Sequence, residues 1–453
     1  MKEVRNLILG FEIARDFSQI AYYDRKAQEP VSVATRVGTN LFTFPTALAK
    51  KKGREEWHFG VDAEYFSERG EAVSVPHFFE AVQTNTTVRF DGQEYETRTL
   101  LAIFMREALK LLGLPELVRA TLAVTVTCER LTGEFAMNVK RALLMDGFTA
   151  DKILIEDNEE SFYYYCYSQQ PSIWTRDIAL IRFGGNFVRF QTLTEMRKMK
   201  PNIASIHPKG TITLPEENVD RDKAFAAFAR KCIGTENFSS VFITGEGFGR
   251  EWARDSVLVL CGQGRRVFEG NNLFVKGAVY AGLEKKERHA MKNRVYFCPY
   301  LLQKGVCVDV IRGESREVLP LIEPGQSWFD EGRAIEGILD STKDVILTLV
   351  SMEPGWHSSV VMHLSGLPER PDRTTRIRIE AACTSDRECL VTVTDLGFGE
   401  LCPATGRTWT KEMYLGPGRA GEGAGAYPPP SPADEDEGTC PQQGEEAMNR
   451  GRN

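Results

Sequence analysis

The sequence lacks the patterns that mark several common classes of protein. Its ten cysteines include no C-x-x-C pair, its six histidines include no H-x-x-x-H pair, and G-x-S-x-G does not occur. These absences argue against zinc sites and against the hydrolases that carry such motifs. No apolar run approaches the roughly 20 residues of a membrane span. Cys128, Cys166, Cys232 and Cys261 stand in apolar segments, as expected of buried free thiols, and this favours a cytoplasmic location.

An excess of positive charge is also missing. The 453 residues carry a formal net charge of −7, with 26% charged and 42% apolar residues. This composition is that of an ordinary globular protein, and the acidic balance argues against a nucleic-acid partner. The length exceeds what one core normally serves, so we expect two or three domains.

What the sequence does contain is a repeated strand–turn–strand pattern. The first copy runs from Asn6–Ala14 into Ser18–Asp24, and the second from Ile178–Asn186 into Phe187–Leu193. A third glycine turn ends the segment Ser240–Gly249. Two such units followed by a strand and a glycine turn are expected of a two-lobed protein that clamps phosphate groups.

Strands and helices alternate between these turns. Apolar residues recur at spacings of three and four over Leu100–Leu112 and Leu131–Leu143, which predicts amphipathic helices. Ala120–Thr127 and Ile153–Glu156 are predicted strands. This alternation predicts an α/β lobe over residues 1–176 and a second lobe over residues 177–292. In the second lobe, Phe274–Gly282 is a predicted helix with a face of small residues.

The pattern changes at about residue 293. Short apolar segments separated by turn residues predict an all-β sandwich over residues 293–414, beginning with a strand at Tyr296–Tyr300. Residues 415–453 are rich in glycine and proline and then acidic. Such a composition predicts a disordered tail.

The order of these elements resembles the superfamily of actin, sugar kinases and the seventy-kilodalton heat-shock chaperones, with the chaperone branch the nearer match over about residues 4–410. Gly10–Ala14 resembles the first phosphate loop and Arg182–Asn186 the second. Val241–Gly249 is similar to the adenosine-binding turn, and Lys276–Gly282 to the second connecting helix. The resemblance implies an actin-like ATPase fold in the two lobes, followed by a β domain like the one that grips peptides.

The sequence departs from the family at the groups that serve catalysis. Glu12 replaces the first-loop aspartate, Arg15-Asp16 replace two threonines, and Arg182 stands where the second loop has an aspartate. In the family these groups hold metal-bound water and position the attacking water. Single groups of this kind are typically worth about 10²–10³ in rate. We therefore expect a degenerate ATPase, with Asp157 as the one further acidic residue that matches the connecting helix.

The resemblance implies ATP or ADP, with Mg²⁺, as the cofactor, and it assigns no catalytic residue and no direct metal ligand. The residues expected to contact the nucleotide are Glu12, Gly184, Gly185, Asn186, Gly245, Glu246 and Gly247.

Other interpretations of the same residues stay open. Gly184-Gly185-Asn186 is also a plain hairpin turn, favoured in type I′ geometry. Arg182 is a candidate to pair with Glu12 across the cleft. The glycines of 245–249, with Glu269 further on, also suggest a dinucleotide fingerprint.

The sequence thus predicts a chaperone-like nucleotide-binding protein that binds a protein or peptide partner through its β domain, by strand addition at a sheet edge. One alternative is a nucleotide-independent actin-like scaffold for cell-division or envelope assembly. A third prediction is a slow Mg-ATPase in which Glu12 and Asp157 hold the metal.

Overall fold

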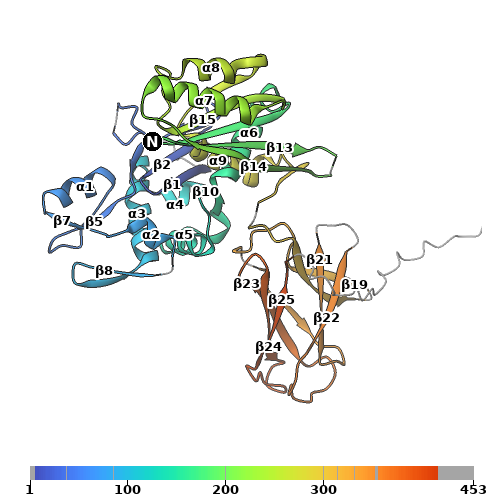
Figure 1. The fold of residues 1–453 in the computed structure, drawn as a ribbon. Helices are drawn as coiled ribbons and strands as arrows, with labels where there is room; N and C mark the ends of the chain where they lie inside the picture. The colour runs from blue at the N-terminus through green and yellow to red at the C-terminus, as the bar shows by residue number, and fades with distance from the viewer. Residues whose placement is uncertain are drawn as a thin grey trace, which may run out of the picture. The chain divides into compact units, whose positions relative to one another are not determined.

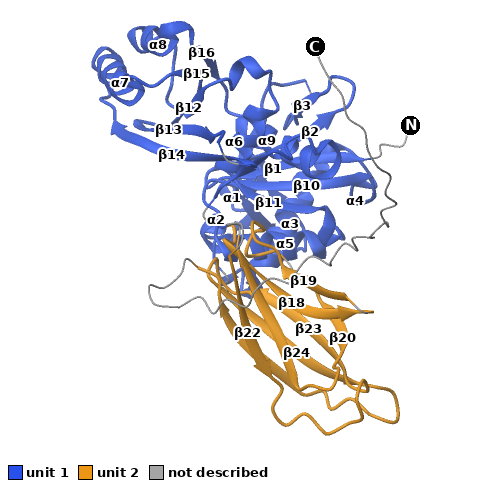
Figure 2. Ribbon diagram, turned by 90° about the vertical axis from the view of Figure 1, so that its right-hand side faces the viewer, with its two compact units in different colours: residues 1–300 blue, residues 301–453 orange. Residues whose placement is uncertain are grey.

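The computed structural model describes residues 6–416 except 37, 85, 199, 299, 314, 331 and 352–355. The chain divides into two compact units, residues 1–300 and residues 301–453 (Figure 2). The predicted boundary at residues 292/293 falls eight residues before this division. Of the predicted tail, Leu415 is buried and Gly416 is described. The remainder, residues 417–453, lies outside the described residues.

Unit 1 is built on two mixed sheets. Sheet I has the strand order β3-β2-β1-β10-β11, with β4 paired to β2. Its strands are β1 (Leu7–Ile13), β2 (Phe17–Asp24), β3 (Glu29–Ser32), β4 (Thr43–Pro45), β10 (Thr121–Cys128) and β11 (Ile153–Asp157). Sheet II has the order β17-β14-β13-β12-β15-β16. Its strands are β12 (Asp177–Gly184), β13 (Phe187–Met196), β14 (Asn202–Thr213), β15 (Phe238–Glu246), β16 (Arg266–Glu269) and β17 (Arg294–Tyr296).

The two sheets repeat one topology. In each, the first strand pairs antiparallel with the next one (β1 with β2, β12 with β13) and parallel with a later one (β10 or β15), which pairs parallel with the strand after it (β11 or β16). A helix follows β11 and β16: α6 (Asn158–Tyr167) in the first half and α9 (Leu273–Leu283) in the second. The repeated strand–turn–strand pattern of the sequence therefore corresponds to a repeat of the whole α/β unit.

Helices cover the outer parts of the sheets. Those of the first half are α1 (Gly60–Glu68), α2 (Phe78–Val82), α3 (Thr97–Leu109), α4 (Leu117–Ala120) and α5 (Gly133–Met145). Those of the second are α7 (Asn218–Ile233) and α8 (Arg254–Cys261). The short helical turns are η1 (Lys110–Leu112), η2 (Ala150–Lys152), η3 (Pro171–Ile173), η4 (Gly262–Gly264) and η5 (Glu284–Arg288). The first half also carries β5 (Leu48–Lys51), β6 (Trp57–Phe59), β7 (Ala72–Ser74), β8 (Thr87–Phe90) and β9 (Gln93–Glu96), which form two small sheets.

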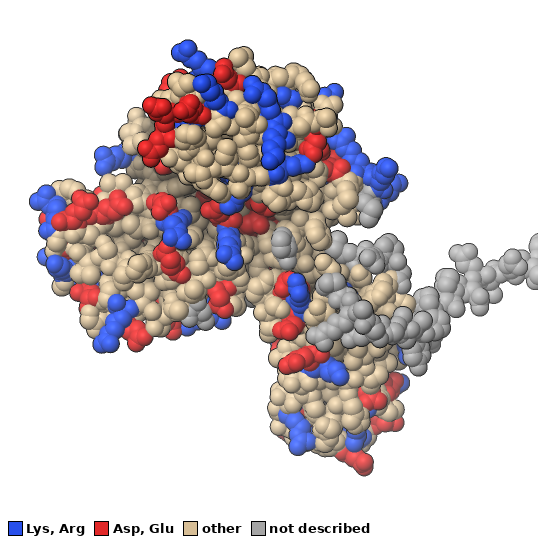
Figure 3. All heavy atoms as spheres, in the orientation of Figure 1, with Lys and Arg blue, Asp and Glu red and all other residues tan. Residues whose placement is uncertain are grey.

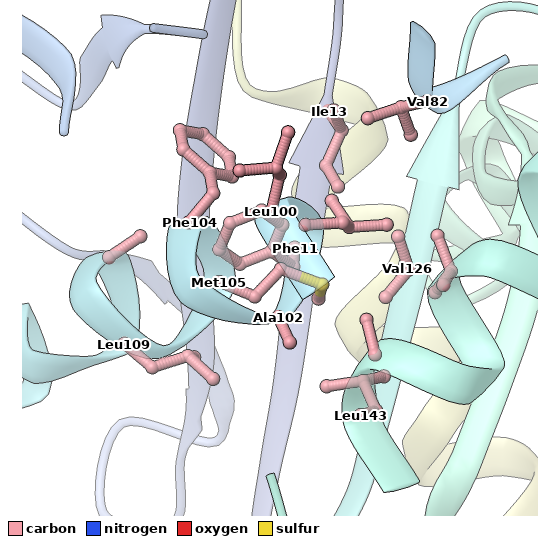
Figure 4. Packing of buried hydrophobic residues seen from close by; sticks show 14 of the residues in the cluster. Phe11, Ile13, Val82, Leu100, Ala102, Phe104, Met105, Leu109, Val126 and Leu143 are labelled. Carbon is pink, nitrogen blue, oxygen red and sulfur yellow. The ribbon is translucent and has the colours of Figure 1, made fainter. Parts of the chain in front are cut away.

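The core of the first half lies between sheet I and the predicted helices α3 and α5 (Figure 4). Phe11 of β1 meets Phe104 of α3 edge to face, with ring centroids 6.2 Å apart. Leu100 and Leu143 are fully buried in the same cluster. The spacing of three and four residues is the reason that one face of each helix contributes to this core.

Helices α6 and α9 lie beside each other in the middle of unit 1 (Figures 1 and 2). A Cβ at Gly277 of α9 would collide with the carbonyl of Ser161 in α6, and one at Gly10 of β1 with the carbonyl of Val275. The small-residue face predicted for Phe274–Gly282 is confirmed, because close approach of backbones requires it. Although α9 follows β16 of sheet II, its side chains pack on sheet I. Helix α6 follows β11 of sheet I, and its Phe162 packs on Phe242 of sheet II.

Unit 2 consists of two antiparallel four-stranded sheets that enclose one core. Their orders are β19-β18-β21-β22 and β20-β23-β24-β25. The strands are β18 (Lys304–Arg312), β19 (Ser315–Ile322), β20 (Ile335–Ile338), β21 (Asp344–Ser351), β22 (His357–His363), β23 (Arg376–Cys383), β24 (Glu388–Gly397) and β25 (Thr408–Tyr414). The all-β prediction is confirmed. The strand expected at Tyr296–Tyr300 is instead Arg294–Tyr296, which pairs with β14 and extends sheet II.

None of the helices in the described part of the chain has both the length and the apolar character needed to cross a bilayer. On the face shown in Figure 3, basic and acidic side chains of the described residues lie side by side.

Candidate functional site

The predicted site residues lie at the carboxyl ends of β1, β12 and β15 and in the turns that follow β12 and β15. Glu12 is the next-to-last residue of β1, and Gly184, Gly185 and Asn186 form the turn from β12 to β13. Gly245 and Glu246 end β15, and Gly247 follows directly. In register, Gly184 lies opposite Glu246.

Glu12 is buried, with only 2% of its surface exposed, and it is surrounded by neutral donors. Gln19 Nε2 of β2 donates to Glu12 Oε2 at 2.7 Å. The Val275 backbone N–H in the first turn of α9 and the Asn158 side chain also donate to it. Burial outweighs these bonds and the positive charge of Arg182, and it raises the pKa of Glu12 to about 7.

A chain of hydrogen bonds joins Glu12 to the third glycine turn. Gln19 Nε2 lies 2.9 Å from the Asn271 carbonyl oxygen, and the Gly245 N–H donates to Asn271 Oδ1 at 2.9 Å. Asn271 stands in the loop before α9. The structure thus brings Glu12 and Gly245 into one hydrogen-bond network across the two sheets. We call the residues of this network (Glu12, Gln19, Gly245 and Asn271), together with the nearby charge of Arg182, the interlobe site.

Arg182 does not form an ion pair with Glu12. Its guanidinium lies 3.2 Å from Glu129 Oε1 and 5.0 Å from the centroid of the Phe274 ring. Glu129 follows directly after β10, and Arg189 also approaches it at 3.7 Å. The ion pair between Glu129 and Arg182 therefore ties sheet I to sheet II, and Arg182 acts on Glu12 only through its charge.

The second glycine turn has a structural explanation. Gly185 has a φ of +65° while Asn186 is not at positive φ, which is the pattern of a type II′ hairpin rather than type I′. A Cβ at Gly247 would collide with the Gly185 carbonyl, so the two glycine turns pack backbone to backbone. Gly185 N–H donates to the Glu246 carbonyl at 2.8 Å.

Arg221 of α7 fastens these two turns together. It donates to Asn186 Oδ1 at 2.6 Å, to the Gly185 carbonyl at 3.0 Å and to the Gly247 carbonyl at 2.9 Å. Its guanidinium also lies 4.8 Å from the Trp252 ring centroid. The glycines expected to contact phosphate are thus held by a buried arginine of the same lobe.

The dinucleotide interpretation of residues 245–249 lacks the context that it requires. That fingerprint needs the glycine turn to open a helix, whereas α8 begins only at Arg254, five residues after Gly249. Glu269 pairs with Arg250 at 2.8 Å.

Asp157 serves as the N-cap of α6. Its Oδ1 accepts the Glu160 N–H at 2.7 Å, which satisfies a free donor at the helix start. Burial raises the pKa of Asp157 to about 7. Within the described residues, no three His, Cys, Asp or Glu side chains converge as a metal-binding group.

A line of buried polar groups continues from the interlobe site. Thr127 Oγ1 lies 2.9 Å from Asn158 Oδ1, and Ser161 Oγ lies 2.9 Å from Thr127 Oγ1 and 2.6 Å from Glu156 Oε1. Glu156 is fully buried, and burial raises its pKa.

The line ends near the last residue of unit 1. Lys285 Nζ lies 3.5 Å from Glu156 and 2.9 Å from Glu160, and the Tyr300 hydroxyl donates to Glu160. The carboxyl groups of Glu156 and Glu160 therefore share the ammonium group of Lys285.

Family comparisons divide the chain at the same place as the structure. Residues 29–299 match the model described as the C-terminal part of a family of unknown function, DUF5716. The match covers more than half of the chain. This protein belongs to the DUF5716 family. Residues 301–415 match a domain of unknown function, DUF8552, and no curated protein matches the chain.

In this DUF5716 protein, two cavities are lined by described residues, and none of the predicted site residues is among them. One of about 470 Å³ lies among the ends of α3 and α5 and the loop before α4, and one of about 310 Å³ lies beside β13 and Glu195. The groups that sequence reasoning missed are Gln19, Glu129, Asn271 and Arg221. Two of these could have been found from the sequence: Gln19 is a polar residue within an apolar strand, and Glu129 directly follows one.

Proposed function

We propose that this chain is a two-lobed protein of the actin and seventy-kilodalton chaperone architecture that acts as a nucleotide-independent scaffold. The repeated strand order and the paired helices α6 and α9 support that architecture. Of the functions predicted from the sequence, the contacts of the interlobe site favour the nucleotide-independent scaffold over the nucleotide-binding chaperone.

The observation that carries the proposal is that the groups expected to bind phosphate already have partners within the protein. Gly245 N–H bonds to Asn271, Gly185 N–H bonds to Glu246, and Arg182 bonds to Glu129. A polyphosphate would have to displace these partners before it gained any bond, which lowers its net affinity.

The acidic groups do not fit a hydrated magnesium ion. Glu12 is buried with its pKa raised to about 7, so it is partly protonated at neutral pH. Asp157 is occupied as a helix cap. Because neither side chain offers a free ionised carboxylate, no catalytic step is assigned to the site.

The test is thermal unfolding of the full chain with Mg·ATP, Mg·ADP or EDTA at millimolar concentration. We expect no shift of the midpoint with any of the three. A ligand at 100 times its dissociation constant would add about 2.7 kcal/mol, so an upward shift with nucleotide would overturn the scaffold proposal in favour of a nucleotide-binding protein. If turnover accompanied the shift and Glu12→Ala abolished it, the slow ATPase would be the answer.

We further propose that a protein or peptide partner adds a strand to β22 of unit 2. Three of the four edge strands carry features that discourage pairing: β19 contains Pro320, β25 contains Lys411 and Glu412, and β20 has only four residues. Between its two terminal histidines, β22 contains only Ser358–Met362, without charge or proline.

This edge is expected to select an extended apolar peptide, because main-chain pairing supplies affinity and alternate side chains supply selectivity. Val361 is 56% exposed on β22, and Val318 is 50% exposed on β19. On an array of apolar peptides, Val361→Lys in the full chain should weaken binding by on the order of tenfold. Val318→Lys should bind as the wild type does. An array without binders, or equal binding by all three proteins, would overturn this proposal.

A further inference from the structure

Two cysteines face each other across the hairpin of unit 2. Cys383 is the last residue of β23, and Cys389 is the second residue of β24, and the antiparallel register places them directly opposite. Directly opposed residues project their side chains to the same face of the sheet. Among the described strand pairs, this is the one place where cysteine lies opposite cysteine.

The position of the pair in the ladder brings the thiols close. The next pair towards the loop carries a backbone bond, because Thr384 N–H donates to the Glu388 carbonyl at 2.9 Å. Hydrogen-bonded and non-hydrogen-bonded pairs alternate along an antiparallel ladder. Cys383 and Cys389 therefore form a non-hydrogen-bonded pair, whose Cα atoms are typically about 4.5 Å apart, within the range that a disulfide spans.

The two thiols differ in exposure and in acidity. Cys389 is 2% exposed and belongs to the core, whereas Cys383 is partly exposed at its rim. A hydrogen bond from the Cys389 thiol lowers the pKa of Cys383. A reactive cysteine has these properties: it is accessible and carries more thiolate than usual.

We infer that Cys383 and Cys389 form a reversible disulfide, a redox site in unit 2. The oxidant is a low-molecular-weight disulfide of the glutathione class. The Cys383 thiolate attacks one of its sulfurs and releases the first thiol, and the Cys389 thiolate then displaces the second thiol from the mixed disulfide. One external disulfide is reduced to two thiols, and the two cysteine thiols become one cystine with loss of two protons from the protein.

The bond joins β23 to β24, the two central strands of their sheet. Cys389 also lies opposite Met413 of β25. Oxidation thus links β23 and β24 covalently, next to β25, at the end near the 384–388 loop. The inference does not depend on nucleotide or partner binding.

The test oxidises the reduced full chain with glutathione disulfide and maps its peptides without reduction. We expect a cross-linked peptide pair containing Cys383 and Cys389 that lacks two hydrogen atoms, and an unfolding midpoint several degrees above that of the reduced protein. Cys383→Ser and Cys389→Ser should each remove both effects. Cys402→Ser, which changes a partly exposed cysteine of the same unit, should keep both.

Three outcomes would overturn the inference. The first is that both thiols still react with iodoacetamide after oxidation. The second is that glutathione stays attached to Cys383. The third is that the cross-link joins either cysteine to a different residue.

Discussion

Two carboxylates that are almost completely buried, one taken from each unit, are held in opposite ways. Asp395 in unit 2 is 1% exposed and Glu12 in unit 1 is 2% exposed. Arg370 donates two hydrogen bonds of 2.8 and 2.9 Å to Asp395, which also accepts from the N–H groups of Gly397 and Thr405 and from the Thr405 hydroxyl. Glu12 receives bonds from amide groups alone.

The consequence appears in their acidities. The bonds from Arg370 hold the pKa of Asp395 well below its usual range, whereas burial raises the pKa of Glu12 to about 7. A buried carboxylate with an adjacent cation is fixed in one charge state, so it serves structure. A buried carboxylate held by neutral donors gains or loses its proton near physiological pH. The charge of the interlobe site therefore depends on pH, whereas the charge of Asp395 in unit 2 does not.

The largest expected effect on stability comes from breaking the ion pair between Arg370 and Asp395. Arg370→Ala leaves Asp395 buried without its cation, which should cost unit 2 roughly 3–5 kcal/mol. Denaturant unfolding of the full chain measures this loss. Arg373→Ala, which removes an exposed partner of Asp340, should leave stability nearly unchanged. Equal effects of the two substitutions would show that Asp395 is not held as described.

An intermediate effect is expected at Glu12. Its pKa is about 7 in the folded state against 4.5 for an unperturbed glutamic acid, so the folded protein binds this proton more tightly. The corresponding stability is fully present below about pH 4.5 and is lost as pH rises through 7, by up to about 3 kcal/mol.

Glu12→Gln should remove this part of the pH dependence and be the more stable protein above neutrality. Urea unfolding of both proteins between about pH 5 and pH 8 measures the difference. Parallel curves for the two proteins would mean that Glu12 does not titrate in this range.

The smallest effect is expected at Arg182. Because Glu129 is 57% exposed, loss of their ion pair in Arg182→Met should cost less than about 1 kcal/mol. The same change removes the charge that lowers the pKa of Glu12, so the pH dependence should move to higher pH. Arg189→Met removes the more distant partner of Glu129 and should not move it. A shift in both variants would assign the effect to Glu129 instead.

The fold was predictable where local patterns decide it. The helices α3, α5 and α9, the buried strand β10 and the change to β structure follow from spacing and composition. The small strands β5 to β9 were not predicted, because they are short and their apolar residues follow no regular spacing. β25 was also missed, because its alternation is carried by Trp409 and Met413 among charged residues.

The candidate site was predictable only in part. Glu12 and the glycine turns were found from sequence, and the structure places them at corresponding strand ends. Their partners could not be found, because Gln19 and Asn271 are 252 residues apart in the chain and no local pattern links them. Arg221 is equally hidden, since one more basic residue on a charged helix carries no signal.

The crossing of α6 and α9 has a consequence for how the protein is made. α9 completes the core on sheet I, yet it is synthesised about 145 residues after β10, the strand that it covers. Until then, Ile8, Ala21 and Ala123 of sheet I lack the apolar side chains of α9 that pack on them. This face of sheet I therefore stays uncovered until α9 has been synthesised, and we expect the two fragments of a chain cut between residues 176 and 177 to be stable only when mixed.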